Sequence, residues 1–187
     1  YNGVSYLIQS DFYKDEITNL FYKNWVIGDN NMNVIVNFLL NTNVSNQMKE
    51  KIDKINPNCE LLTTRKTFPF AKRFCIKATI AGGAMLHRLN LSESILFFDA
   101  HRILYKDNKE FYLALKEIKL KIPEKKLVVE SDDVQDSINL MKTGVDVIQL
   151  DKVFLENIEK IVAYKNENYP HIKIQTAGGI NLINEES

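Results

Sequence analysis

The chain has 187 residues, of which 45% are apolar and 26% charged. This balance excludes an intrinsically disordered chain and fits one domain, or one core domain with a short appendage. Lys and Arg together number 24, as do Asp and Glu, so no overall basic charge would hold nucleic acid or an anionic membrane nonspecifically.

The cysteines and the apolar segments lead us to expect a cytoplasmic protein with no membrane segment. Cys59 and Cys75 lie in apolar stretches, where a buried, reduced thiol is favoured, and two cysteines cannot form a disulfide framework or a four-cysteine zinc site. The apolar runs are far shorter than the roughly 20 residues of a membrane span. The N-terminus lacks the basic and apolar regions of an export signal.

The first quarter of the chain predicts a small element followed by one helix. Residues 1–32 carry aromatic side chains without a clear period, and we expect only a small N-terminal element there. Residues 34–56 have apolar side chains at mostly helical spacing and are followed by Pro57. They predict one amphipathic helix that packs against the core and introduces the first strand.

From residue 60 onward, β-rich runs alternate with helical runs. The expected strands are residues 60–64, 95–98, 126–130, 145–150 and 172–176. The expected helices are residues 71–81, 108–121, a segment capped by Ser131 or Asp132 that runs to Thr143, and 154–166. Gly82-Gly83, Pro123 and Gly144 are suited to end the first three helices. Such repeated units predict parallel strands, in a barrel or in an open doubly wound sheet.

Polar residues at the strand ends favour the barrel. Clusters lie at or just beyond the C-terminal end of each expected strand: Thr64-Arg65-Lys66, Asp99, Glu130, Asp151 and Thr176-Ala177-Gly178-Gly179. In a parallel (β/α) barrel these ends meet at one mouth, the usual site of chemistry. No Gly-x-Gly-x-x-Gly follows the first strand, which weakens a dinucleotide-binding interpretation.

These clusters have the chemistry of a site for anions and a sugar. Arg65-Lys66 and His87-Arg88 combine a guanidinium with a second polar or charged group, which suits carboxylate or phosphate. Solvated surface charge and a structural histidine are the alternatives. Glu130 and Asp151 would stand side by side and hold Mg²⁺ or ribose hydroxyls, unless Asp151 caps a helix.

Bare backbone N–H groups at Ala177-Gly178-Gly179 offer a phosphate site, for which a simple tight turn is an equal alternative. The clusters together suit a phosphorylated sugar with magnesium and an anionic second substrate.

Several motifs resemble, in chain order, those of the type II phosphoribosyltransferases typified by quinolinate phosphoribosyltransferase. They are Thr64-Arg-Lys-Thr-Phe-Pro69, Ala81-Gly-Gly-Ala84, His87-Arg-Leu89, Ser92-Glu-Ser-Ile-Leu96 with His101, Val128-Val-Glu130, Ile148-Gln-Leu-Asp-Lys152 and Ala177-Gly-Gly-Ile-Asn181. Within these transferases the chain is most similar to the ModD branch of pyrophosphorylases associated with molybdenum transport. The resemblance covers about residues 34–184.

The resemblance implies a (β/α) barrel of the nicotinate/quinolinate phosphoribosyltransferase type, incomplete here at its C-terminus. Residues 33–187 would form the barrel domain and 1–32 a remnant of an N-terminal α/β domain. It implies a homodimer or higher homo-oligomer in which a neighbouring subunit completes each active site. The implied reaction is transfer of the phosphoribosyl group of phosphoribosyl pyrophosphate, with Mg²⁺, to an unidentified anionic or heteroaromatic acceptor.

The resemblance also implies roles for individual residues. Thr64, Arg65, His87 and Arg88 would bind the acceptor, Lys66 the diphosphate, Glu130 and Asp151 the ribose and Mg²⁺, and Ala177, Gly178 and Gly179 the 5′-phosphate. Phe98 departs from the quinolinate pattern, in which a lysine contacts an acceptor carboxylate. An arginine that the family sends into the partner's site falls near Asn33. The alternatives are quinolinate phosphoribosyltransferase of NAD biosynthesis and a non-catalytic, anion-binding barrel.

Overall fold

The computed structural model describes residues 46–63, 72–88, 90 and 92–178. They form two compact units, which divide between residues 89 and 90, and each unit is described by itself. The expected N-terminal element, residues 1–32, lies outside the described residues. No helix in the described ranges is long and apolar enough to span a membrane.

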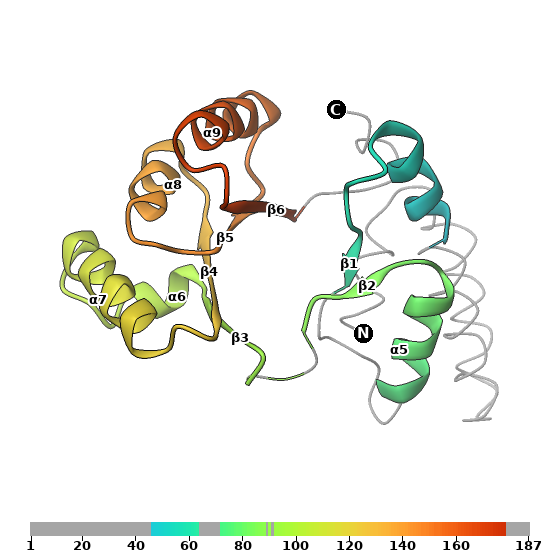
Figure 1. Ribbon diagram of the computed structural model, residues 1–187, viewed down its shortest axis with the longest axis horizontal. Helices are drawn as coiled ribbons and strands as arrows, with labels where there is room; N and C mark the ends of the chain where they lie inside the picture. The colour runs from blue at the N-terminus through green and yellow to red at the C-terminus, as the bar shows by residue number, and fades with distance from the viewer. Residues whose placement is uncertain (1–45, 64–71, 89, 91, 179–187) are drawn as a thin grey trace, which may run out of the picture. The chain divides into compact units, whose positions relative to one another are not determined.

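The described part of the first unit, residues 46–63 and 72–88, contains two short parallel strands and two helical segments. Residues 46–55 are helical, which confirms the C-terminal part of the expected helix. Strand β1 (Leu62–Thr63) pairs in parallel with β2 (Met85–Leu86), and α5 (Lys72–Ala81) connects them (Figure 1). Gly83 has a φ of +80° just after α5, the left-handed conformation expected where a glycine ends a helix.

Two features of the first unit were not expected. Strand β2 was missed, because two residues are too few for any period to appear in the sequence. Cys59 was expected to be buried, but it is exposed and Cys75 is only partly buried. The burial prediction for Cys59 was wrong because Cys59 lies in the turn that precedes β1, where the chain is exposed from Asp53 to Glu60.

The second unit is built on a parallel sheet of four strands. These are β3 (Ser94–Phe97), β4 (Lys126–Ser131), β5 (Val147–Asp151) and β6 (Lys173–Ala177), and they lie in the order β3-β4-β5-β6. Each strand ends within one residue of its predicted end. The strand order follows the chain without reversing, as in a barrel wall and unlike a doubly wound sheet.

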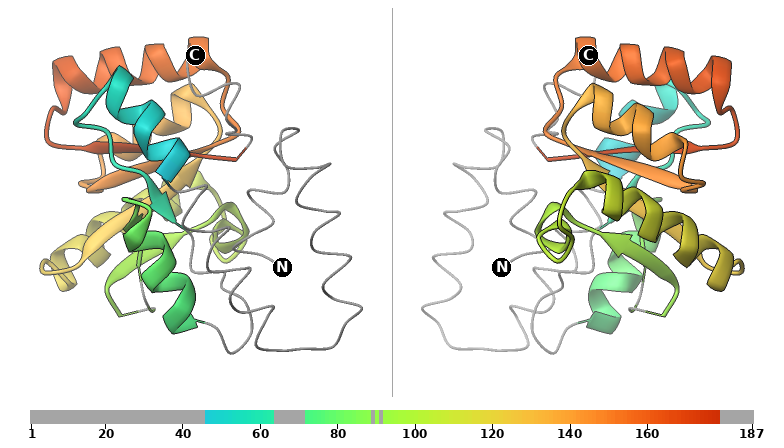
Figure 2. Two further views of the ribbon diagram at one scale, coloured as in Figure 1. Left: turned by 90° about the vertical axis from the view of Figure 1, so that its right-hand side faces the viewer. Right: turned by 90° about the vertical axis from the view of Figure 1, so that its left-hand side faces the viewer.

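Helices connect these strands and cover one face of the sheet. They are α6 (Asp99–Arg102), α7 (Asn108–Lys121), α8 (Val134–Met141) and α9 (Leu155–Asn168), and Figure 2 shows α7, α8 and α9 packed along the sheet. The bounds of α7 match the prediction. The predicted cap of α8 was wrong: Asp133 is the N-cap and accepts from the Asp136 N–H, because Ser131 still belongs to β4.

Alternation along the strands divides the sheet into two faces. Leu127 and Val129 of β4 and Ile148 and Leu150 of β5 are almost fully buried, and they pack with helix residues in one core cluster. The residues between them point to the opposite face, which we call the site face. Its members at the C-terminal ends of the strands are Glu130, Gln149, Asp151, Gln175 and Ala177.

Candidate functional site

Two carboxylates of the site face interact at the ends of β4 and β5. Glu130 and Asp151 are both partly buried. Burial, followed by repulsion from Asp151, raises the pKa of Glu130 above its ordinary value, although hydrogen bonds from the Asp99 backbone and Gln149 oppose the rise. In the β4–β5 register Glu130 pairs with Gln149, and Asp151 lies two residues further along β5 on the same face of the sheet. A cation or hydroxyl donors bound between the two groups would relieve this repulsion.

The turn after β6 lies against Asp151. The N–H of Lys152 donates to the Ala177 carbonyl at 2.9 Å, which joins the ends of β5 and β6. Gly178 has a φ of +76°, and a Cβ built there would lie 2.5 Å from Oδ1 of Asp151. Phe154, rather than Asp151, is the N-cap of α9. Asp151 therefore does not cap that helix, and its carboxylate lies against a glycine backbone.

We expect Gly178→Ala to weaken ligand binding at Asp151 and to lower the free energy of unfolding by about 1–3 kcal/mol, because alanine strains a left-handed backbone. Gly144→Ala is the matched control, since Gly144 has a φ of +85° but its built Cβ meets nothing closer than 3.8 Å. Denaturation and calorimetric titration with phosphoribosyl pyrophosphate measure the two effects. Equal binding by both variants would show that the Gly178–Asp151 approach has no role in binding.

Phe98 lies one residue beyond β3, at the level of Glu130 in the sheet. Its neighbour Phe97 packs edge-to-face on Phe111 in the core, so Phe98 is directed away from that core. Its N–H donates to Nδ1 of His101 at 2.9 Å, and the two rings stack with centroids 5.7 Å apart. The Phe98 side chain remains 38% exposed. It presents a partly exposed apolar side chain at the C-terminal end of β3.

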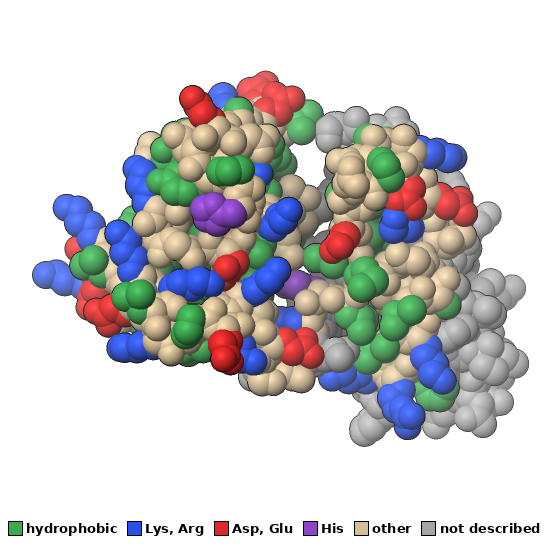
Figure 3. Space-filling view, viewed as in Figure 1, with side chains coloured by type: hydrophobic (Ala, Val, Ile, Leu, Met, Phe, Trp, Pro, Cys, Tyr) green, Lys and Arg blue, Asp and Glu red, His purple; other side chains and the backbone are tan. Residues whose placement is uncertain are grey.

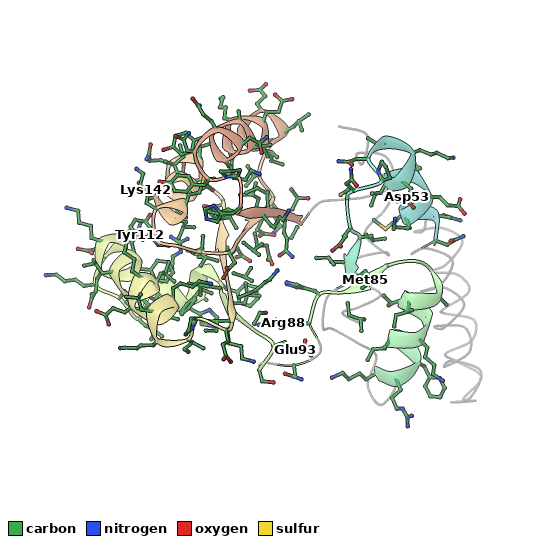
Figure 4. The ribbon with its side chains drawn as sticks, viewed as in Figure 1. Asp53, Met85, Arg88, Glu93, Tyr112 and Lys142 are labelled. Atoms are coloured by element: carbon green, nitrogen blue, oxygen red, sulfur yellow. The ribbon has the colours of Figure 1, made fainter. Side chains whose placement is uncertain are left out.

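The remaining candidate residues lie either in the first unit or outside the described residues. His87 is partly buried and Arg88 is buried. Both residues follow β2 in the first unit, and Figure 4 labels Arg88. Thr64, Arg65, Lys66 and Gly179 lie outside the described residues. The structure therefore places Phe98, Glu130, Asp151, Ala177 and Gly178 at the C-terminal ends of the strands of the second unit, and the roles of all the candidate residues remain predictions.

The pair of carboxylates has a donor set that fits magnesium. Mg²⁺ usually keeps several waters and is held by one or two carboxylates together with substrate phosphates. Within the described ranges, no group of three or more His, Cys, Asp or Glu could hold a metal. A Mg²⁺ ion held by Glu130 and Asp151 would take its remaining ligands from water and from substrate phosphates.

Sequence reasoning missed a buried ion pair directly beneath Glu130. Arg102 donates from Nη1 and Nη2 to the two carboxylate oxygens of Asp136 at 2.8 and 2.7 Å, and Nη2 also donates to the Glu130 carbonyl at 2.7 Å. Tyr112 of α7 (Figure 4) and Ser131 donate to the same carboxylate at 2.5 and 2.7 Å. The end of β4 is thereby anchored to three helices.

The electrostatics of this network are consistent with a charged pair. Burial would raise the pKa of Asp136, but hydrogen bonds from Arg102, Tyr112 and Ser131 more than offset it and hold the pKa below its ordinary value. Burial and the hydrogen bond to Asp136 raise the pKa of Tyr112 to about 12.

On the surface of the second unit, basic and acidic side chains are interspersed over the face seen in Figure 3.

A singly wound parallel sheet with polar side chains at the C-terminal ends of its strands is the arrangement in which (β/α) barrels place their active sites. The family described as quinolinate phosphoribosyl transferase, C-terminal domain, matches residues 42–186. The chain belongs to this family.

Curated relatives include pyrophosphorylases. A pyrophosphorylase ModD of Escherichia coli is 32% identical over 136 residues, which are 73% of this chain and 48% of the relative. The corresponding protein of Pasteurella multocida is 32% identical over 141 residues, 74% of this chain and 49% of its own. A nicotinate-nucleotide pyrophosphorylase (carboxylating) of Dictyostelium discoideum is 27% identical over 120 residues, 63% of this chain and 38% of its own. The chain thus spans about half the length of the ModD relatives that it matches.

Solved structures agree on the fold. NadC from Streptococcus pyogenes superposes with a TM-score of 0.63 at 24% identity and covers 74% of this chain and 47% of its own. A nicotinate-nucleotide pyrophosphorylase from Ehrlichia chaffeensis superposes with a TM-score of 0.62 at 21% identity. The match covers 75% of this chain and 48% of the Ehrlichia chain. The fold is therefore that of the nicotinate/quinolinate phosphoribosyltransferases.

Proposed function

We propose that this protein is a phosphoribosyltransferase of the ModD type. It transfers the phosphoribosyl group of phosphoribosyl pyrophosphate to a ring nitrogen of an anionic or heteroaromatic acceptor. The bond from the ribose C1 to the diphosphate oxygen breaks, the bond from C1 to nitrogen forms, and pyrophosphate leaves. The observation that carries this proposal is the interacting pair Glu130 and Asp151, set against the Gly178 turn at the strand ends of this family's fold.

In this proposal the side chains bind and orient the reactants. Glu130 and Asp151 accept hydrogen bonds from ribose hydroxyls and hold Mg²⁺, which would neutralise charge on the diphosphate. Backbone N–H groups of Ala177-Gly178-Gly179 bind the 5′-phosphate. Such positioning and stabilisation of developing charge lower the barrier without a covalent intermediate.

The remaining contacts in the proposal come from basic residues and from a second subunit. Lys66 binds the diphosphate, and Thr64, Arg65, His87 and Arg88 bind the acceptor. In the proposal a homodimer or larger homo-oligomer completes the site, and the enzyme works in the cytoplasm. The proposal includes the link to molybdenum transport that the resemblance to the ModD branch implies.

Two alternatives are weaker. The protein could be a quinolinate phosphoribosyltransferase of NAD biosynthesis, which the names of its carboxylating relatives favour. The apolar Phe98 argues against it, since a dicarboxylate acceptor would lose a cationic partner. A barrel that only binds anions would gain nothing from Glu130 and Asp151, which repel anions.

Calorimetric titration with phosphoribosyl pyrophosphate, with and without Mg²⁺, tests the proposal. We expect Mg²⁺-dependent binding by the wild type and about tenfold to hundredfold weaker binding by Asp151→Asn, because charge-assisted hydrogen bonds contribute about 1.5–3 kcal/mol. Glu117→Gln is the control, since Glu117 is an exposed residue of α7. Absence of Mg²⁺-dependent binding to the wild type would rule out the proposed function.

A further inference from the structure

Three polar side chains form a row across the site face that the proposed function only partly uses. Glu130 of β4 is in register with Gln149 of β5, and Gln149 is in register with Gln175 of β6. In-register residues of parallel strands project from the same face of the sheet. The row lies two residues before Asp151 and Ala177, or roughly 7 Å deeper along the strands. It therefore forms the floor beneath the groups assigned to ribose and phosphate.

The hydrogen bonds of this row define what its members can still bind. Nε2 of Gln149 donates to Oε2 of Glu130 at 3.2 Å. A carboxylate accepts only, so this contact directs the amino group of Gln149 toward Glu130 and its carbonyl away. Oε1 of Gln175 is buried and has no hydrogen-bond partner in the structure. The row thus presents an unused acceptor at the Gln175 end and a carboxylate at the other.

An unpartnered buried carbonyl is uncommon in folded proteins, because the group has lost its water without gaining a partner. A ligand that donates a hydrogen bond restores that partner. A ligand carboxylate in the same place would bring only further acceptors to the Gln175 carbonyl and would leave it without a partner. The floor of the site is therefore complementary to an N–H or O–H donor.

We infer that Gln175 is a specificity residue that receives a hydrogen-bond donor of the acceptor substrate. The acceptor would be a heteroaromatic ring with an amide, amino or hydroxyl group on the side that faces β6. Any carboxylate of the acceptor would then lie elsewhere on the ring. This inference rests on the proposed phosphoribosyltransferase function and adds the substrate class.

Two pyridines that differ in one group test this assignment. Calorimetry of the whole chain with nicotinamide, which has an amide donor, and nicotinate, which has a carboxylate, is expected to show at least about tenfold tighter binding of nicotinamide. Gln175→Met removes the acceptor and should reduce the preference to less than about threefold. Gln175→Glu restores an acceptor and should restore the preference. Gln135→Met, at an exposed position of α8, should behave as wild type.

Binding of phosphoribosyl pyrophosphate distinguishes a failure of the proposed enzyme function from a failure of the Gln175 assignment. A wild type that does not bind phosphoribosyl pyrophosphate would count against the enzyme function itself. If the wild type binds it but binds neither pyridine, binds both equally or prefers nicotinate, the Gln175 assignment is overturned. An unchanged preference in Gln175→Met would overturn it as well.

Discussion

Replacing Arg102 by alanine is expected to lower the free energy of unfolding by about 3–5 kcal/mol, because it leaves a buried carboxylate without its counter-charge. The side chains of Arg102 and Asp136 are only 13% and 14% exposed. The guanidinium also lies 4.8 Å from the centroid of the Phe111 ring, and the substitution removes this cation–π contact too. Chemical denaturation followed by circular dichroism measures the loss.

An exposed ion pair provides the control for this prediction. Lys121 and Glu117 are 74% and 69% exposed, so Lys121→Ala should cost less than about 1 kcal/mol. Arg102→Lys keeps the charge but cannot bind both oxygens of Asp136 as a planar fork. Its loss in free energy of unfolding should therefore lie between those of Arg102→Ala and Lys121→Ala. A loss for Arg102→Ala no greater than that for Lys121→Ala would show that the network contributes little to stability.

The pH dependence of the stability lost in Arg102→Ala follows from the direction in which the pKa of Asp136 is shifted. Because the pKa is lowered in the folded protein from its ordinary value of 3.8, the stabilisation is fully present above that value. It is lost as the pH falls through the lower, folded-state pKa. The difference in stability between wild type and Arg102→Ala should therefore be constant near neutral pH and shrink below about pH 4.

Phe98→Lys is expected to raise turnover of quinolinate by roughly a hundredfold or more. Phe98 follows directly after β3, its ring stacks on His101, and it offers no charge to a second carboxylate of the acceptor. A charge left incompletely paired in a closed site costs several kcal/mol, and each 1.4 kcal/mol is about tenfold in rate. Steady-state kinetics with phosphoribosyl pyrophosphate and Mg²⁺ measure the change.

A second lysine variant controls for added charge alone. Phe154 is 82% exposed at the start of α9, so Phe154→Lys should leave quinolinate turnover unchanged. A wild type that already turns over quinolinate at about 10⁴ M⁻¹s⁻¹ or faster would favour the quinolinate alternative. No gain in Phe98→Lys would show that this side chain does not face the acceptor.

The local pattern of the sequence was sufficient to predict the βα units. The ends of β3, β4, β5 and β6 were predicted within one residue, because short apolar runs bounded by polar residues mark buried parallel strands. Gly83 and Gly144, both with positive φ, ended the predicted helices because only glycine adopts that conformation without strain. Glu130 and Asp151 were identified for the same local reason, since each ends a strand.

Only the tertiary structure decided which side chains pair across the chain. Arg102 and Asp136 are 34 residues apart, and no periodicity in the sequence relates them. The row of Glu130, Gln149 and Gln175 depends on strand register, which is set by packing of the opposite face rather than by the polar residues themselves. Local spacing determines where elements begin and end, whereas register and helix packing decide which polar groups meet a partner and which remain available to a ligand.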